Sequence, residues 1–147
     1  MKSLFESDAH QEIINRIDKL NENSTANWGK MTVGQMAHHC QYPLNIVLGK
    51  NNYNLKPNWF VNILFKKSMY SDKLWRKNLP TVPHFREKEN KDFNIEKTNL
   101  VALIEELYAH KNKTQWQPHP TFGKLSAEQW GKMQYKHLDH HLRQFDA

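Results

Sequence analysis

The chain has 147 residues, enough for one domain with a buried core and too few for two ordinary ones, so a single domain over residues 1–147 is expected. Hydrophobic residues make up 38% and charged residues 24%, which excludes a disordered chain, and no stretch reaches the ~18 apolar residues of a membrane span. The formal charge is +6, but the basic residues are spread along the chain, without a zinc-finger, RNP or helix-turn-helix signature. A soluble, cytoplasmic protein is therefore expected, with neither nucleic acid nor a membrane as its partner.

The first half of the chain predicts three helices. One covers about residues 7–21, where isoleucines and a leucine recur at helical spacing. The second begins with a capping box at Thr32 and continues to about residue 48, with a kink expected one turn after His39 because Pro43 removes a backbone hydrogen bond. A shorter helix follows over about residues 58–69, directly after a proline.

The second half predicts a long connection and two further helices. Residues 71–96 show little periodicity and are expected to wrap around the helices. The next helix begins near Thr98, a loop covers residues 112–125, and the final helix opens with a capping box at Ser126. No segment predicts a strand. The expected class is all-α, a four-helix bundle with an extra short helix and long connecting loops.

Two histidines on the final helix, His137 and His141, are the strongest functional signal. Residues four apart lie on one face of a helix, about 6 Å apart along its axis, close enough for two imidazoles to share a metal ion. Met133 and Phe145 continue the same row, so the pair lies on the stripe that faces a core. Such histidines are either metal ligands or hydrogen-bonded core residues, and spacing alone leaves both interpretations open.

A third histidine, His39, lies at a matching depth on the second predicted helix. It follows the start of its helix by seven residues, whereas His137 and His141 precede the end of theirs by about seven and three. If the two helices are antiparallel, the three side chains fall within about one turn of the same level. If the helices are parallel, the side chains miss each other by one to two turns.

Two motifs that contain these histidines resemble a known superfamily. Residues 28–39 read Trp-x-x-x-Thr-Val-x-Gln-Met-Ala-x-His, and residues 136–144 read Lys-His-x-x-His-His-x-x-Gln. Together they resemble the DinB/YfiT-like metalloenzyme superfamily. The stretch from His119 to Phe145, with His-Pro-x-Phe-Gly-x-Leu-Ser before the final helix, is similar to an uncharacterised branch of that superfamily, domain of unknown function 1569.

The resemblance implies a DinB-like four-helix bundle with one divalent metal ion, Zn²⁺ or Ni²⁺, held by His39, His137 and His141. It favours His39 over His38 because members of the superfamily keep a ligand seven residues after the capping Thr or Ser. His140 points off the inward row and is expected at the surface or beside the ligands. Three neutral imidazoles leave at least one open position on the ion, where chemistry can occur.

The wider superfamily includes thiol S-transferases and a thiol-dependent isomerase. The resemblance therefore implies a metal-dependent transferase or hydrolase that acts on a small-molecule substrate, such as a low-molecular-weight thiol, and a chain that can form a homodimer. The alternative is a non-catalytic helical bundle in which the histidines are structural or bind a metal for stability alone.

Three other residues are candidates for a role near such a site. His119 is a candidate acid or base, although a structural role beside Pro120 is favoured. Cys40 is expected to be a buried, inert thiol, because on a helix it faces away from its neighbour His39. Gln144 either orients a ligand or is exposed at the end of its helix.

Overall fold

The computed structural model describes every residue of the chain except Thr81, and the described residues form an all-helical structure. Its elements are α1 (Ser7–Asp18), α2 (Val33–His39), α3 (Gln41–Val47), α4 (Trp59–Tyr70), the 3-10 helix η1 (Pro83–Phe85), α5 (Phe93–Ala109) and α6 (Ala127–Gln144). Pairing of the β type is limited, in this part of the chain, to one isolated bridge between His119 and Gly123. The prediction of an all-α fold is confirmed. None of the described helices combines the length and the apolar character needed to cross a membrane.

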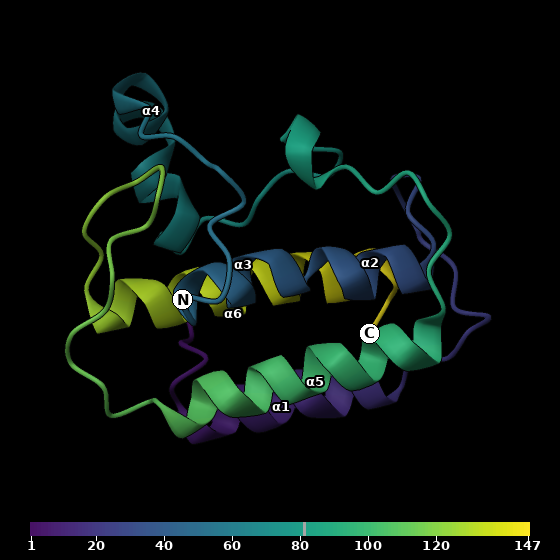
Figure 1. Ribbon diagram of the computed structural model, residues 1–147. Helices are drawn as coiled ribbons and strands as arrows, with labels where there is room; N and C mark the ends of the chain where they lie inside the picture. The colour runs from purple at the N-terminus through teal and green to yellow at the C-terminus, as the bar shows by residue number, and fades with distance from the viewer. Residues whose placement is uncertain (81) are drawn as a thin grey trace.

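The long helices lie close together, and α4 packs on α6 and projects from the rest (Figure 1). α2 and α3 follow one another and run in the opposite direction to α6, while α5 runs alongside α1. α2 and α3 both pack on α5, α1 packs on α6, and α3 also contacts α6. These contacts enclose a single hydrophobic core.

Each long helix buries an apolar stripe in that core. In α1 the stripe contains Ile13 and Ile17, and in α6 it contains Leu138 and Leu142, in each case four residues apart. Full burial of one such side chain contributes about 1.5–3 kcal/mol. The other large apolar side chains that are almost completely buried are Leu4, Met36, Leu44, Leu100, Ile104, Leu107 and Trp130.

Two capping boxes set the starts of α2 and α6, the helices that bear the clustered histidines. Thr32 Oγ1 accepts a hydrogen bond from the N–H of Gln35 at 3.2 Å, and the Gln35 side chain accepts one from the N–H of Thr32 at 3.0 Å. Ser126 and Gln129 make the same pair of bonds at 3.1 and 2.9 Å. Each box satisfies two backbone donors that a helix start leaves without partners. Both predicted capping boxes are confirmed.

The predicted second helix is two helices, α2 and α3, separated at Cys40. Pro43 has no N–H to offer the carbonyl of His39, and its ring crowds that carbonyl. The break therefore falls directly after His39, and the prediction of a kink one turn later is wrong. Cys40 keeps right-handed helical angles (φ −65°, ψ −16°), so α3 continues in nearly the direction of α2. Gly49, with φ +73°, follows the end of α3 as predicted.

Two helix boundaries differ from those expected. α5 begins at Phe93 instead of near Thr98, because the Asp92 side chain caps it by accepting a hydrogen bond from the N–H of Ile95 at 3.0 Å. α1 ends at Asp18, three residues early, because polar side chains in residues 21–24 bond to nearby backbone instead. α4 agrees with the predicted short helix to within one residue.

Gly34 allows the connection that precedes α5 to lie directly against α2. A β-carbon on Gly34 would lie 2.1 Å from the backbone oxygen of Lys91. Next to this contact, the Gln35 side chain donates a hydrogen bond to the carbonyl of Glu89 at 2.9 Å. The connection therefore wraps along α2, as expected, except that Thr81 lies outside the described residues.

A buried lysine ties α4 to α6. Lys136 is only 2% exposed, and its Nζ donates hydrogen bonds to the carbonyls of Ser68 at 2.7 Å and Ser71 at 2.9 Å and to the Ser71 hydroxyl at 3.4 Å. These carbonyls lie at the C-terminal end of α4, where a helix lacks internal donors and its dipole favours a cation. Three acceptors satisfy the three donors of the ammonium group, which offsets much of the loss of water on burial.

We expect Lys136→Met to loosen α4 while leaving the other helices folded, since the carbonyl of Ser71 would lose its ammonium donor and that of Ser68 would keep the Trp75 indole N–H at 3.0 Å. The free energy of unfolding should fall by about 1–3 kcal/mol, the usual effect of leaving such groups unpaired. Hydrogen–deuterium exchange should quicken in the amides of α4. Lys132→Met, one turn earlier on α6, serves as the control because it removes only an ion pair with exposed Glu128. Equal exchange at α4 in the two variants would contradict the anchoring role.

Candidate metal centre

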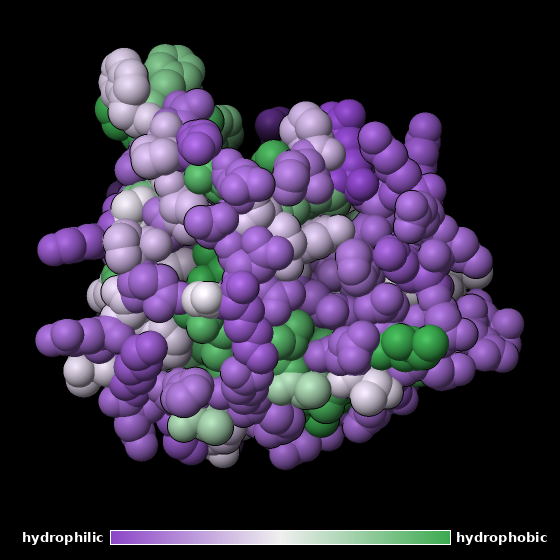
Figure 2. Space-filling view, in the orientation of Figure 1, coloured by the Kyte–Doolittle hydropathy of each residue, from purple (hydrophilic) through white to green (hydrophobic). Residues whose placement is uncertain are grey.

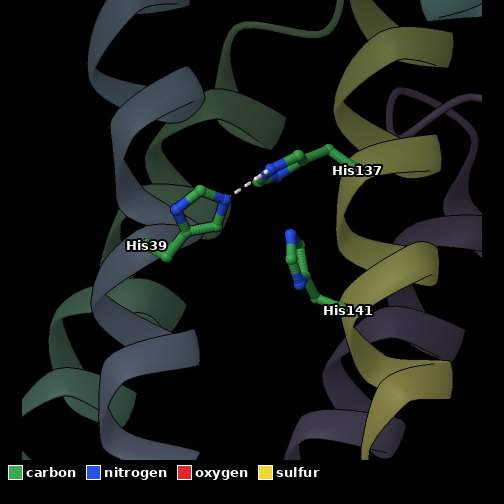
Figure 3. Close-up of side chains that lie close together, drawn as sticks. All are labelled: His39, His137 and His141. Carbon is green, nitrogen blue, oxygen red and sulfur yellow. Dashed lines mark hydrogen bonds between the residues drawn. The ribbon is translucent and has the colours of Figure 1, made fainter. Parts of the chain in front are cut away.

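Three histidines from distant parts of the sequence come together between α2 and α6 (Figure 3). His39 is the last residue of α2, and His137 and His141 lie one turn apart on α6. One ring nitrogen from each lies within 4.8 Å of the others, and the Nε2 atoms of His39 and His137 are 3.3 Å apart. The side chains thus converge, as expected for antiparallel helices. Their role as metal ligands stays a prediction.

The three rings surround a common point. Ring centroids are 5.1 Å apart for His39 and His137, 4.8 Å for His39 and His141, and 4.7 Å for His137 and His141. The ring planes are inclined to one another by 40°, 71° and 70°, so none of the pairs is stacked. Rings inclined in this way turn their edges toward the centre, and Figure 3 shows ring nitrogens facing it.

Hydrogen bonds at the outer ring nitrogen fix the orientation of two of the imidazoles. Nδ1 of His39 lies 3.1 Å from the carbonyl oxygen of Phe85, and Nδ1 of His141 lies 3.0 Å from Oε1 of Gln144. The Gln144 amide nitrogen donates to the carbonyl of Trp28, which identifies the other amide atom as the oxygen. Because both partners can only accept, Nδ1 carries the proton in each ring, and Nε2 presents its lone pair to the centre.

The environment of the cluster keeps the imidazoles neutral. Burial lowers the pKa of His39, and burial together with the neighbouring imidazoles lowers the pKa of His137 and of His141 well below the ordinary value. Neutral imidazole is the form that binds a metal. Lone pairs that face one another repel unless a cation or a shared proton lies between them.

The chemistry of these nitrogens, and the spacing of the His39–His137 pair, fit a divalent transition metal. Two nitrogen ligands at about 2.0–2.1 Å from a tetrahedral ion lie about 3.3–3.4 Å apart, and the Nε2 atoms of His39 and His137 are 3.3 Å apart. Imidazole suits Zn²⁺, Ni²⁺ and related ions, whereas Mg²⁺ and Ca²⁺ prefer oxygen ligands. A site of three histidines, without a carboxylate, therefore favours the first group.

A cleft of about 360 Å³ reaches the cluster from the surface at His141. His137 also keeps part of its surface exposed. The cleft therefore gives a small molecule a route to the side of the cluster at His141. Residues in the cleft wall that also contact the cluster or its neighbours are Trp28, Phe85, Glu87, His140 and Gln144.

Glu87 is a feature of the cleft that the sequence did not reveal. Its side chain is only 4% exposed, and Oε1 lies 2.7 Å from Nδ1 of His38. Tyr42 bonds to the same carboxylate, which together with burial raises the pKa of the Tyr42 hydroxyl. In the sequence Glu87 belongs to a charged run that is typical of a solvated loop. The nearest residue whose type could indicate that this loop packs against the helices is the aromatic Phe85, two positions earlier.

The other candidates lie outside the cluster. His140 sits between the rings of Trp28 and Trp75, with centroids 6.1 and 5.6 Å away, beside the clustered residues as expected. Cys40 is buried, and burial raises the pKa of its thiol, which agrees with the expected inert role. Gln144 is buried and orients His141, the first of its two expected alternatives.

His119 supports a loop and is not brought to the three histidines. Its Nδ1 accepts hydrogen bonds from the N–H groups of Thr121 at 3.0 Å and Phe122 at 3.2 Å. Burial, with a smaller effect of Lys66, lowers the pKa of His119 to about 4. These contacts match the favoured structural role.

Residues 2–147 match a family model described as Protein of unknown function (DUF1569). No curated protein and no solved structure matches the chain significantly. The match covers nearly the whole chain, including all three clustered histidines, and brings no named activity with it.

We expect the metal-free protein to lose stability as the pH falls below about 6.5. In the unfolded chain each imidazole takes up a proton near that pH, whereas half-buried His137 and buried His141, with their lowered pKa values, remain neutral in the folded chain. Acid therefore favours unfolding. Each such group lowers the free energy of unfolding by up to about 1.4 kcal/mol per pH unit between its two pKa values, and has no effect at higher pH.

Urea titrations at several pH values measure this effect. His137→Leu should flatten the pH dependence, because it removes one titrating group. Met133→Leu, a buried change one turn earlier on the same row, should retain the full dependence. If His137→Leu and Met133→Leu behave alike, the imidazole of His137 is not the group that resists protonation.

Proposed function

We propose that this chain, which belongs to the DUF1569 family, binds one divalent metal ion through His39, His137 and His141 and acts as a metal-dependent transferase or hydrolase on a small molecule. The observation that carries the proposal is the 3.3 Å approach of the Nε2 atoms of His39 and His137. The hydrogen bonds from Nδ1 of His39 and of His141 support the proposal further. They keep the proton on Nδ1 and so direct the Nε2 lone pairs of both rings toward one point.

The proposal includes a DinB-like fold and a specific class of metal. If α2 and α3 are counted as one interrupted helix, α1, α2–α3, α5 and α6 correspond to a four-helix bundle and α4 to an extra short helix. Zn²⁺ or Ni²⁺ is proposed because both accept three imidazoles and leave a position for a further ligand.

The metal would supply Lewis acidity, since a bound divalent ion lowers the pKa of a water or thiol ligand toward neutral pH. The protein positions the groups around it. Phe85 and Gln144 hold two imidazoles by their Nδ1 atoms, and the cleft admits the substrate from the side of His141. Glu87 accepts a hydrogen bond from Nδ1 of His38 at 2.7 Å, an arrangement that suits a carboxylate-oriented acid or base.

The alternative function is a bundle whose metal serves stability alone. Structural metal sites are closed by protein ligands, whereas catalytic sites keep a position open. The cleft at His141 and the partial exposure of His137 support the catalytic alternative.

We expect His137→Ala or His141→Ala to abolish tight metal binding, since two imidazoles remain and no neighbour on α6 can rotate into the site. Gln144→Ala should retain the site but weaken it about 10–100-fold, the usual effect of removing a group that orients a ligand. Elemental analysis and competition with a chelator, on folded protein made without a histidine tag, provide the measurements.

The matched controls are His140→Ala, which removes a neighbouring imidazole from the same helix, and His10→Ala, which removes a buried imidazole on α1. Both should bind metal as the original protein does. Equal loss of metal in all four histidine variants would contradict the assignment of the ligands.

We also expect a low-molecular-weight thiol to bind to the metal-loaded protein, because thiolate is a soft ligand and the charge of the ion favours the deprotonated thiol. Cobalt-substituted protein should develop a thiolate-to-metal charge-transfer band as the thiol is added. The band should be absent in His137→Ala and present in His140→Ala. With cobalt confirmed in the site, no spectral change at saturating thiol would favour water as the activated group instead.

A further inference from the structure

The helix α4 turns large apolar side chains toward the solvent, and none of its residues is fully buried. Its side chains Trp59, Phe60, Ile63 and Leu64 are 73%, 59%, 69% and 54% exposed. At about 100° per residue these four positions share one face of the helix. In Figure 2 apolar side chains gather at the tip of α4, which stands out from the body of the molecule. A contiguous apolar patch of this kind marks an interaction surface.

Polar contacts hold α4 with this face outward. On the inner side, the Asn62 amide donates to the carbonyl of Phe122 at 3.1 Å, and Nζ of Lys66 donates to the carbonyl of Lys124 at 2.8 Å. Lys136 holds the carbonyl of Ser68 in the same way. The exposure of the apolar face is therefore part of the folded structure.

The net charge of the protein is concentrated around this helix. Residues 51–86 contain seven of the 21 lysines and arginines but only one of the 15 acidic residues, Asp72. The rest of the chain has 14 residues of each sign, so the whole excess of +6 lies in this segment. Asp72 is itself paired with the N-terminal amine. Basic residues are spread along the chain, as the sequence indicated, but acidic residues are scarce in this segment.

Charge and side-chain chemistry together select the partner. A second copy of the chain would bring the same positive segment against this one, which opposes association. The bases of single-stranded nucleic acid stack on aromatic rings, but this mode of binding does not explain the exposed aliphatic side chains Ile63 and Leu64. An anionic bilayer surface can bind aromatic, aliphatic and basic side chains together. The aromatic and aliphatic side chains enter the headgroup region, and the lysines bind the lipid phosphates.

We propose that the outward face of α4, which consists of Trp59, Phe60, Ile63 and Leu64, docks on the surface of a bilayer that contains anionic lipids. Lys67 is exposed on the same face, one turn after Ile63 and Leu64, and Lys56 is exposed just before the helix. The sequence-based expectation of no membrane partner depended on the lack of a spanning segment. Binding at the surface needs no such segment.

Co-sedimentation with vesicles tests the proposal. The full chain should bind to phosphatidylcholine vesicles in which phosphatidylglycerol makes up about a quarter of the lipid. It should bind much more weakly to vesicles of phosphatidylcholine alone, and added salt should weaken binding to the anionic vesicles. The double variant Ile63→Asp, Leu64→Asp should lose at least about tenfold in partitioning, since it places charges in the apolar face. Lys67→Ala should lose about fivefold. Neither change touches a buried residue, so circular dichroism should be unchanged.

Matched controls come from exposed positions outside the segment. Ile95→Asp adds a charge at an isoleucine of α5 that is 61% exposed, and Lys111→Ala removes an exposed lysine after that helix. Both should bind vesicles as the original protein does. Equal losses in Ile95→Asp and in the α4 double variant would overturn the proposal.

The remaining outcomes also decide it. No binding to the anionic vesicles beyond that to phosphatidylcholine would overturn the proposal. In that case, a dimer that light scattering shows to dissociate in the α4 double variant would assign the face to a second copy of the chain. Binding of a labelled single-stranded oligonucleotide that the same variant abolishes would assign it to nucleic acid.

Discussion

The hydrogen bond between Nδ1 of His39 and the carbonyl of Phe85 links the helical core to the cleft. It joins groups 46 positions apart at 3.1 Å and can form only if the connection before α5 lies directly on α2. Gly34 permits that approach, because any β-carbon would collide with the oxygen of Lys91. The same approach brings Glu87 against His38. One close backbone contact thus sets the tautomer of a candidate ligand and one wall of the cleft.

The opposite side of α6 is held by a polar network that leaves the histidine row facing α2. Nη1 of Arg16 lies 2.8 Å from Oδ1 of Asp139, and Nε of Arg16 donates to the carbonyl of Ala147 at 2.9 Å. The Tyr135 hydroxyl donates to Glu12 at 3.0 Å. These bonds tie α6 to α1 on the side away from His137. Rotation of α6 about its axis would break them, so the network stabilises the direction in which the histidines point.

Local geometry explains which parts of this structure the sequence predicts. The spacing of His137 and His141 and the capping boxes at Thr32 and Ser126 involve residues within four positions of one another, where helix geometry leaves little choice. The placement of His39 also needed the direction of α2 relative to α6. Glu87 and the carbonyl of Phe85 could not be predicted, because a backbone acceptor has no sequence signature and a loop carboxylate has no periodicity. Pro43 predicts an interruption of the second helix, but the break lies one turn earlier than predicted, directly after His39.

The separation of the clustered histidines along the chain has a consequence for the order of folding. His39 and His137 are 98 positions apart, so their nitrogens meet only after α2 and α6 have packed through the core. In a zinc finger, ligands that are close in sequence allow the ion to organise the chain from the start. Here an ion has no assembled site to enter until the long-range packing is complete. Metal binding would therefore be the last step of folding. The ion would bind only to chains that have already reached the native arrangement.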